Sequence, residues 1–188
     1  MSEFERLSEQ TTWEGKIIRV GVETFRHADG EQVTREKVWH PGAVGILAVD
    51  STHVWLTRQP REAVDDAASL EIPAGKLDVP GEPPLDTAKR ELAEEIGKRA
   101  ERWREIETFH TSPGFSDERV WLYLATELSD ELVESEENER IEIVAWELER
   151  LDQAIAECED SKSLIALLWL ALALARGELA SDRGEHRR

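Results

Sequence analysis

Residues 71–97 read EIPAGKLDVPGEPPLDTAKRELAEEIG, a loop followed by a segment with helical spacing and a strongly acidic face. Glu91, Glu94 and Glu95 lie three and four residues apart, so a helix would project all three from one side. Like charges placed in this way cost an isolated helix about 0.2–0.5 kcal/mol per pair. A hard divalent cation would neutralise them, because clustered carboxylates are its natural ligands. The stretch therefore predicts a metal site suited to phosphate chemistry.

The helix in this stretch is expected to begin near Pro84 and to end at Gly97, because proline is tolerated in a first turn and glycine is a good stop. Its apolar residues recur every three or four positions and are expected to pack on a sheet: Leu85, Ala88, Leu92 and Ile96. Arg90 precedes Glu94 by four residues, so its guanidinium can orient that carboxylate. The alternative for Arg90 is an ordinary helix ion pair.

The chain has 188 residues and a formal net charge of -18, which favours one domain with an acidic surface. Such a surface repels nucleic acids and anionic membranes, so neither is expected as a partner. Cys158 is the single cysteine, which excludes an internal disulfide and fits a reducing compartment. The N-terminus is too polar for a signal peptide, and the apolar run at 164–175 is too short for a membrane span. A soluble, cytoplasmic protein is therefore expected.

Alternating and β-branched segments predict strands with helices interspersed between them. Residues 16–39 are expected to form a hairpin, and residues 43–49, AVGILAV, a buried strand. The other expected elements are strands at 54–57, 103–110, 119–126 and 141–146, and helices at 149–158 and 161–176, with Ser161 as the N-cap of the last. This order predicts an α/β fold, an α+β arrangement with a mixed sheet between helical layers. The expected division is a hairpin region at 1–40, a main domain at 41–178 and a polar tail at 179–188.

The acidic stretch resembles the Nudix box, G-x5-E-x7-R-E-U-x-E-E-x-G-U, in which U is apolar. The positions that fill it are Gly75, Glu82, Arg90, Glu91, Leu92, Glu94, Glu95 and Gly97. The chain departs from the pattern twice: six residues instead of five separate Gly75 from Glu82, and Lys98 stands at the last apolar position. Neither departure removes a candidate ligand. The insertion leaves the geometry of the loop at 76–81 open.

Further segments resemble the ADP-ribose pyrophosphatase branch of the Nudix hydrolases. EIPAGKLD, residues 71–78, is similar to its E-[LIF]-P-A-G-x-[LI]-[DE] motif. Pro113 follows Gly97 by sixteen residues, and its loop at 112–118, SPGFSDE, resembles the loop that marks enzymes acting on ADP-ribose and related nucleoside diphosphate sugars. Residues 58–61, RQPR, resemble R-Q-[YF]-R with Pro60 replacing the aromatic residue. The resemblance covers residues 14–178. It implies a Nudix-type α/β/α sandwich with an N-terminal antiparallel β-hairpin extension.

The resemblance also implies the chemistry, which is Mg²⁺-dependent hydrolysis of the diphosphate bond of ADP-ribose to AMP and ribose 5-phosphate, with Mn²⁺ as a possible substitute metal. The implied metal ligands are the carbonyl of Ala74 and the carboxylates of Glu91, Glu94, Glu95 and Glu139. Glu137 is the implied catalytic base, and Glu139 is the next candidate for that role. Arg90 is an implied catalytic residue that Glu82 braces. The alternative for Glu137 and Glu139 is that they belong to a solvated acidic loop.

The resemblance assigns the substrate contacts to three regions. They are Arg61 for a phosphate, Ser112, Gly114 and Glu118 for the terminal ribose, and Ile17, Arg35 and Glu36 for the adenine across a two-fold homodimer. The alternative for the last set is ordinary hairpin residues, for Arg61 a surface arginine, and for Glu118 a metal ligand. Most of the seven tryptophans are expected in the core, and Trp39 is the candidate for base stacking.

Three other functions remain open from the sequence. The same chemistry on another sugar nucleotide, such as ADP-glucose or GDP-mannose, is the nearest alternative. A non-catalytic sensor of nucleotide sugars would not need metal carboxylates, yet Glu91, Glu94 and Glu95 are all present. A nucleoside triphosphatase is disfavoured by the hairpin and by the loop at 112–118.

Overall fold

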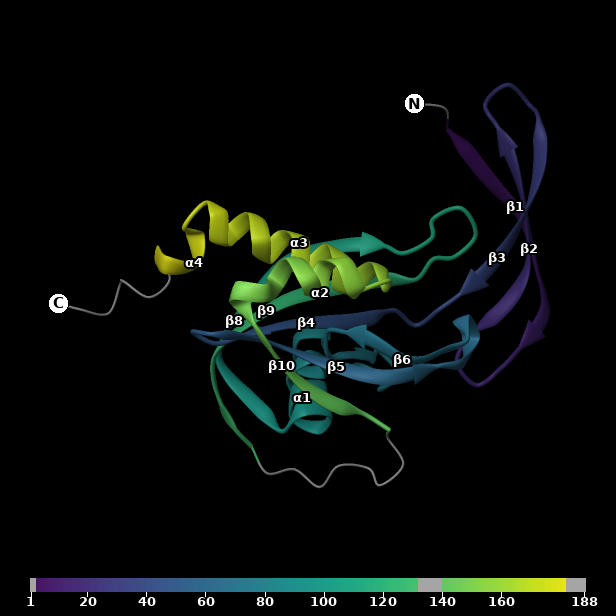
Figure 1. The fold of residues 1–188 in the computed structure, drawn as a ribbon. Helices are drawn as coiled ribbons and strands as arrows, with labels where there is room; N and C mark the ends of the chain where they lie inside the picture. The colour runs from purple at the N-terminus through teal and green to yellow at the C-terminus, as the bar shows by residue number, and fades with distance from the viewer. Residues whose placement is uncertain (1–2, 132–139, 182–188) are drawn as a thin grey trace.

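The computed structural model describes residues 3–131 and 140–181 of the chain. In these ranges the strands form a seven-stranded mixed sheet and a separate three-stranded sheet (Figure 1). The large sheet contains β4 (Ala43–Val49), β5 (His53–Arg61), β6 (Asp66–Glu71), β7 (Ala74–Lys76), β8 (Lys98–His110), β9 (Arg119–Asp130) and β10 (Glu142–Glu147). The helices are α1 (Pro84–Ile96), α2 (Leu151–Glu157), α3 (Ser161–Ala175) and α4 (Glu178–Ser181), with short 3-10 turns at Glu62–Val64 and Leu148–Arg150.

Strand β4 lies at the centre of the large sheet and runs parallel to β9, while its other neighbours are antiparallel. The strand order is β10-β5-β4-β9-β8, with β6 paired to β5 and β7 paired to β4. Side chains along β4 alternate between two cores, because successive residues of a strand point to opposite faces. Leu47 and Val49 join one hydrophobic cluster, and Val44, Ile46 and Ala48 join the other. The apolar run AVGILAV is therefore a strand buried on both faces, as predicted.

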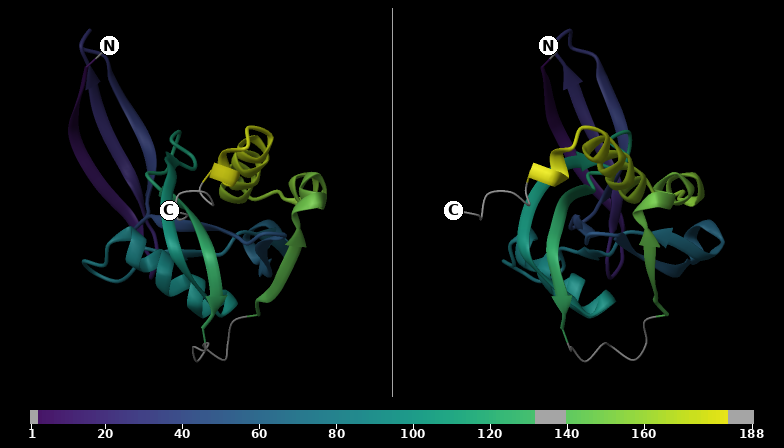
Figure 2. Two further views of the ribbon diagram at one scale, coloured as in Figure 1. Left: turned by 90° about the vertical axis from the view of Figure 1, so that its left-hand side faces the viewer. Right: turned by 60° about the vertical axis from the view of Figure 1, so that its left-hand side comes forward.

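Helix α1 covers one face of the sheet, and α2 and α3 cover the other (Figures 1 and 2). Ala88, Leu92 and Ile96 of α1 pack in the cluster of Ile46, while Leu167 and Leu170 of α3 pack in the cluster of Leu47. This confirms the predicted α/β/α sandwich around a mixed sheet. Within the two described ranges, no helix combines the length and the apolarity that a membrane span requires.

The three-stranded sheet at the N-terminus stands away from the body of the molecule in both views of Figure 2. Its strands are β1 (Phe4–Glu14), β2 (Arg19–His27) and β3 (Gln32–Trp39), all antiparallel. The predicted hairpin is the β2–β3 pair, but β1 was not foreseen, because its sequence is polar and almost every residue in it is exposed. The sheet meets the body where Val38 donates its N–H to the carbonyl of Phe115 at 2.8 Å.

Local boundaries differ from the predicted ones in two instructive places. The N-cap of α3 is Asp160, not Ser161: the Asp160 carboxylate accepts the N–H of Ser163 at 3.0 Å. Helix α2 begins at Leu151, after the 3-10 turn at Leu148–Arg150, so the expected helix at 149–158 is shorter than predicted. Both differences lie at helix termini, where boundaries shift by one or two residues and a terminal turn is often a 3-10 turn.

Candidate active site

A cavity of about 910 Å³ gathers residues from both sides of the sheet's central strands. Its lining includes Ala74 from β7, Glu91, Glu94 and Glu95 from α1, Arg61 from β5 and Glu118 from the loop before β9. Arg90 lines it as well, so seven of the predicted site residues, which lie between positions 61 and 118 of the sequence, share one hollow.

Arg90 is bonded to two carboxylates of the acidic face of α1. Its Nη1 donates at 2.8 Å to Glu91 Oε1 and at 2.8 Å to Glu94 Oε2. Its Nη2 lies 3.2 Å from Glu82 Oε2. The hydrogen bond to Glu82 is the main reason that the pKa of Arg90 is raised, with Glu91 and Glu94 adding to it. The guanidinium therefore relieves the repulsion that the sequence places on this helix.

Glu82 reaches Arg90 in spite of the extra residue in the preceding loop. The loop closes with a turn in which Glu82 donates its N–H to the carbonyl of Val79 at 3.1 Å. Glu82 also accepts a hydrogen bond from Thr87 Oγ1 at 2.7 Å. Hydrogen bonds from Arg90 and Thr87 lower the pKa of Glu82. The insertion is absorbed in the turn, and the brace between Glu82 and Arg90 that the resemblance implied is present.

The Pro-Ala-Gly turn brings backbone atoms up to α1. The N–H of Ala74 donates to Glu95 Oε2 at 2.9 Å, and Ala74 pairs with Gly45 of β4. A Cβ atom built on Gly75 would lie 2.1 Å from the carboxyl carbon of Glu91. Only glycine permits this approach, because any side chain would displace either the turn or the glutamate.

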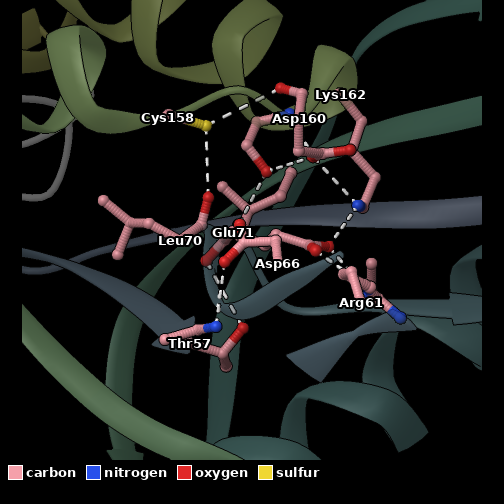
Figure 3. A network of polar contacts seen from close by, with 12 residues as sticks. Thr57, Arg61, Asp66, Leu70, Glu71, Cys158, Asp160 and Lys162 are labelled. Carbon is pink, nitrogen blue, oxygen red and sulfur yellow. Dashed lines mark hydrogen bonds and ion pairs between the residues drawn. The ribbon is translucent and has the colours of Figure 1, made fainter. Parts of the chain in front are cut away.

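On the opposite side of the cavity, a buried carboxylate joins β5 and β6 to the start of α3 (Figure 3). Glu71 is only 2% exposed and receives Arg61 Nε at 2.6 Å and Arg61 Nη2 at 2.8 Å. Lys162 Nζ donates to the same carboxylate at 2.6 Å. Burial by itself raises the pKa of Glu71, but Arg61 and Lys162 outweigh it and lower the pKa to about 2. The predicted phosphate ligand Arg61 is therefore already bound to a fixed anion.

The loop between β8 and β9 brings Glu118 into the cavity. Glu118 Oε2 accepts a hydrogen bond from Thr111 Oγ1 at 2.7 Å, and Glu118 Oε1 lies 3.6 Å from His40 Nδ1. The carbonyl of Ser112 accepts the N–H groups of Phe115 and Ser116 at 3.1 and 2.9 Å, which folds the loop back on itself.

A second hollow, of about 440 Å³, lies between this loop and the N-terminal sheet. Arg35 and Glu36 of β3 line it together with Gly114 and Phe115 of the same chain. Ile17 is outside this lining, at the β1–β2 turn, where it is 49% exposed. The ring of Trp39 is covered by Arg19, whose guanidinium carbon lies 3.6 Å from the ring centroid.

The predicted base Glu137 and the predicted ligand Glu139 lie outside the described residues. The main cavity is also lined by residues that the sequence did not assign to the site, among them His40, Glu71 and Lys162. Glu71 was noted as part of a motif, yet nothing in the sequence relates it to Lys162, which lies 91 positions away. A long-range contact of this kind leaves no local pattern.

Known proteins share this combination of loop, helix and sheet. The NUDIX domain family matches residues 39–168, from the end of β3 into α3. The chain belongs to the Nudix family. The resemblance of the acidic stretch to the Nudix box is thereby confirmed.

Curated relatives of this Nudix chain include an ADP-ribose pyrophosphatase of Bacillus subtilis (strain 168), 39% identical over 175 residues that cover 90% of this chain and 94% of the relative. A methanol dehydrogenase activator of Bacillus methanolicus is 34% identical over 175 residues, with the same coverage of 90% and 94%. A solved structure described as an ADP compounds hydrolase has a TM-score of 0.81 at 22% identity, covering 93% of this chain and 96% of that chain. The structural match supports the Nudix fold, and the Bacillus subtilis relative confirms the similarity to the ADP-ribose pyrophosphatase branch.

The donor set of this Nudix site has the chemistry that a hard cation needs. Three carboxylates and one peptide group line one cavity, and oxygen ligands of this kind suit Mg²⁺ and Mn²⁺. Across residues 3–131 and 140–181, no three histidine, cysteine or acidic side chains converge on one point, and Arg90 contacts two of the carboxylates instead. The residues present fit a divalent cation by type and by shared location.

Proposed function

We propose that this Nudix protein hydrolyses the diphosphate bond of ADP-ribose in the presence of Mg²⁺, giving AMP and ribose 5-phosphate. The observation that carries the proposal is the single cavity that holds the α1 carboxylates, the Ala74 peptide and Arg61 together. The curated relative named ADP-ribose pyrophosphatase, with 94% of its length covered, supports this substrate over other diphosphates.

In the proposed site, Glu91, Glu94, Glu95 and the carbonyl of Ala74 would hold the divalent cation. A cation held there would supply positive charge to neutralise the diphosphate and to lower the pKa of the attacking water. Arg90 keeps the carboxylates of Glu91 and Glu94 oriented, since it bonds both at 2.8 Å. A base must lie within hydrogen-bond reach of the attacking water to remove its proton. Glu137 is proposed for this role, with Glu139 as the next candidate.

The proposed substrate contacts come from the main cavity, from the loop before β9 and from the N-terminal sheet. Arg61 donates hydrogen bonds to a phosphate oxygen, and charge-assisted bonds of this type favour arginine. Glu118 accepts hydrogen bonds from the terminal ribose, next to Ser112 and Gly114. Ile17, Arg35 and Glu36 cover the adenine across a two-fold homodimer, which the exposed N-terminal sheet supports. A cytoplasmic location is proposed from the single cysteine.

A substrate panel tests the proposed function. ADP-ribose, ADP-glucose, GDP-mannose, NADH and deoxynucleoside triphosphates are each incubated with the purified protein and Mg²⁺, and the products are separated by chromatography. ADP-ribose is expected to give the highest kcat/KM, with AMP and ribose 5-phosphate as products. Preference for another sugar nucleotide would change the substrate assignment but keep the chemistry. Absence of turnover with every diphosphate sugar would overturn the proposal.

A further inference from the structure

The turn between α2 and α3 holds the backbone on both sides of Glu71 (Figure 3). Cys158 donates its thiol hydrogen to the carbonyl of Leu70 at 3.2 Å, and burial raises the pKa of this thiol, which keeps it protonated. The N–H of Ile72 donates to Ser163 Oγ at 2.9 Å. A segment about ninety residues later in the chain thus fixes the end of β6.

The Glu71 carboxylate is in turn held from two directions. Arg61 contributes two hydrogen bonds, at 2.6 and 2.8 Å, and Lys162 contributes one at 2.6 Å. Lys162 is itself held by Asp160, whose carboxylate lies 2.9 Å from Nζ and also caps α3. With Glu71 only 2% exposed, the guanidinium of Arg61 cannot rotate without breaking charge-assisted hydrogen bonds to a buried anion.

Lys162 also increases the positive charge of Arg61 that is available to an anionic ligand. A buried glutamate paired with Arg61 alone would neutralise most of the charge of the guanidinium. Lys162 shares the same carboxylate oxygen, Oε2, so Glu71 is divided between two cations. A guanidinium has five N–H donors, and only Nε and Nη2 of Arg61 face Glu71. The side chain of Arg61 remains 42% exposed and lines the cavity.

We propose that Lys162 is a positioning residue for substrate binding. It holds and partly neutralises Glu71, and Glu71 holds Arg61 with its outer N–H groups directed at a substrate phosphate. This inference rests on the proposed function, because it requires that Arg61 meets a phosphate. It adds a role for the start of α3, which carries none of the residues of the Nudix box.

A double-mutant cycle tests the proposal with ADP-ribose as substrate. Arg61→Met is expected to raise KM about tenfold, on the scale of one charge-assisted hydrogen bond. Lys162→Met is expected to raise KM about threefold in the wild-type background and to leave KM unchanged in the Arg61→Met background. Lys162→Arg should keep KM near the wild-type value. KM does not depend on the concentration of folded enzyme, so partial unfolding of a variant does not mimic the effect.

The matched control is Lys89→Met, which removes a lysine that pairs with Asp86 on the surface of α1 at 3.2 Å, outside the cavity lining. Its KM should equal that of the wild type. An equal rise in KM for Lys162→Met in both backgrounds would mean that Lys162 contacts the substrate itself. That result, or an unchanged KM in the wild-type background, would overturn the proposal.

A second measurement separates this inference from the proposed function. The Nε–H signal of Arg61 in a ¹⁵N NMR spectrum of the ligand-free protein should exchange slowly with water, because Nε is bonded to a buried carboxylate. Lys162→Met should accelerate this exchange at least tenfold, and Lys89→Met should leave it unchanged. If no substrate is hydrolysed but the exchange accelerates, the proposed function fails and the positioning role stands. Unchanged exchange in Lys162→Met would refute the positioning role.

Discussion

At the scale of single residues, one arginine offsets the repulsion among the carboxylates of the acidic helix. Arg90 contacts Glu91 and Glu94 through the same nitrogen and Glu82 through another. Glu95 is oriented separately, by the N–H of Ala74. The site therefore has two independent supports for its carboxylates, one from a side chain and one from the backbone.

Glu95→Gln tests whether the Glu95 carboxylate holds the cation, because the substitution removes its charge and nearly keeps its shape. An amide oxygen can still accept the N–H of Ala74, so the fold should survive, while the charge that holds the cation is lost. Turnover of ADP-ribose should fall by about 10²-fold or more, the scale of removing one electrostatic stabiliser. Mg²⁺ should raise the midpoint of thermal unfolding of the wild type and not of the variant. Glu101→Gln, at an exposed position, is the control; near-normal rates in Glu95→Gln would contradict the assignment.

Glu71→Gln tests the buried ion pairs through the pH dependence of stability. The pKa of Glu71 is about 2 in the folded protein, below the ordinary glutamate value of 4.5, so its contribution to stability is complete above pH 4.5 and is lost as the pH falls toward 2. The shift corresponds to about 3 kcal/mol of unfolding free energy. In urea titrations, the variant should be less stable at pH 7, and the difference from the wild type should shrink by about half at pH 3. A difference that is constant with pH would contradict the ion-pair account.

At the scale of elements, the three-residue strand β7 holds the central strand and the acidic helix together at the site. It pairs with β4 and packs on α1, so it joins the central strand to the acidic helix. Helix α1 was predicted within one residue of its observed ends, because its start, its stop and its apolar spacing are all local signals. Gly97 ends the helix with φ 62°, the left-handed conformation that favours glycine.

Gly75→Ala tests the contact between β7 and α1. The added methyl group would lie 2.1 Å from the carboxyl carbon of Glu91, so the turn or the glutamate must move. We expect a loss of about 1–3 kcal/mol of stability, as for other overpacked sites, and a loss of at least tenfold in turnover. Gly177→Ala is the control, because its surroundings are open and only its φ of 71° is strained. It should cost about 1 kcal/mol of stability without affecting turnover. Equal turnover in both variants would refute the contact.

At the scale of the whole molecule, the chain combines a strongly acidic body with a projecting sheet. The sheet exposes large apolar side chains, with Phe4 66% and Trp13 56% accessible. Such exposure favours association, whereas the net charge of -18 on each chain opposes it. The proposed homodimer therefore depends on a balance between these two terms.

Light scattering at several salt concentrations tests this balance. The mass should be twice the 21.4 kDa of one chain at 0.5 M NaCl, with dissociation toward the monomer at low ionic strength, where the repulsion is unscreened. Trp13→Ser should weaken the dimer at every salt concentration. Val79→Ser, which changes an exposed apolar residue outside the N-terminal sheet, should not. A monomer at all concentrations of salt would exclude the shared adenine site.

The sequence by itself determined the elements whose signals are local. Helix α1, the buried strand β4 and the β2–β3 hairpin follow from spacing, from apolar runs and from turn residues such as Gly30 and Gly97. The Nudix box was recognisable for the same reason, because most of its residues lie on one helix whose periodicity fixes which side chains share a face.

Only the tertiary structure decided which distant residues meet. Strand β1 pairs with β2 along an edge that its polar sequence does not predict. The contact of Lys162 with Glu71 joins residues 91 positions apart, and such a pair leaves no periodic trace in the sequence. Hydrogen bonds and ion pairs depend on distance in space, whereas sequence patterns report only neighbours along the chain. The carboxylates of α1 could therefore be predicted from the sequence. The hydrogen bonds that hold Arg61 through Glu71 and Lys162 became visible only in the tertiary structure.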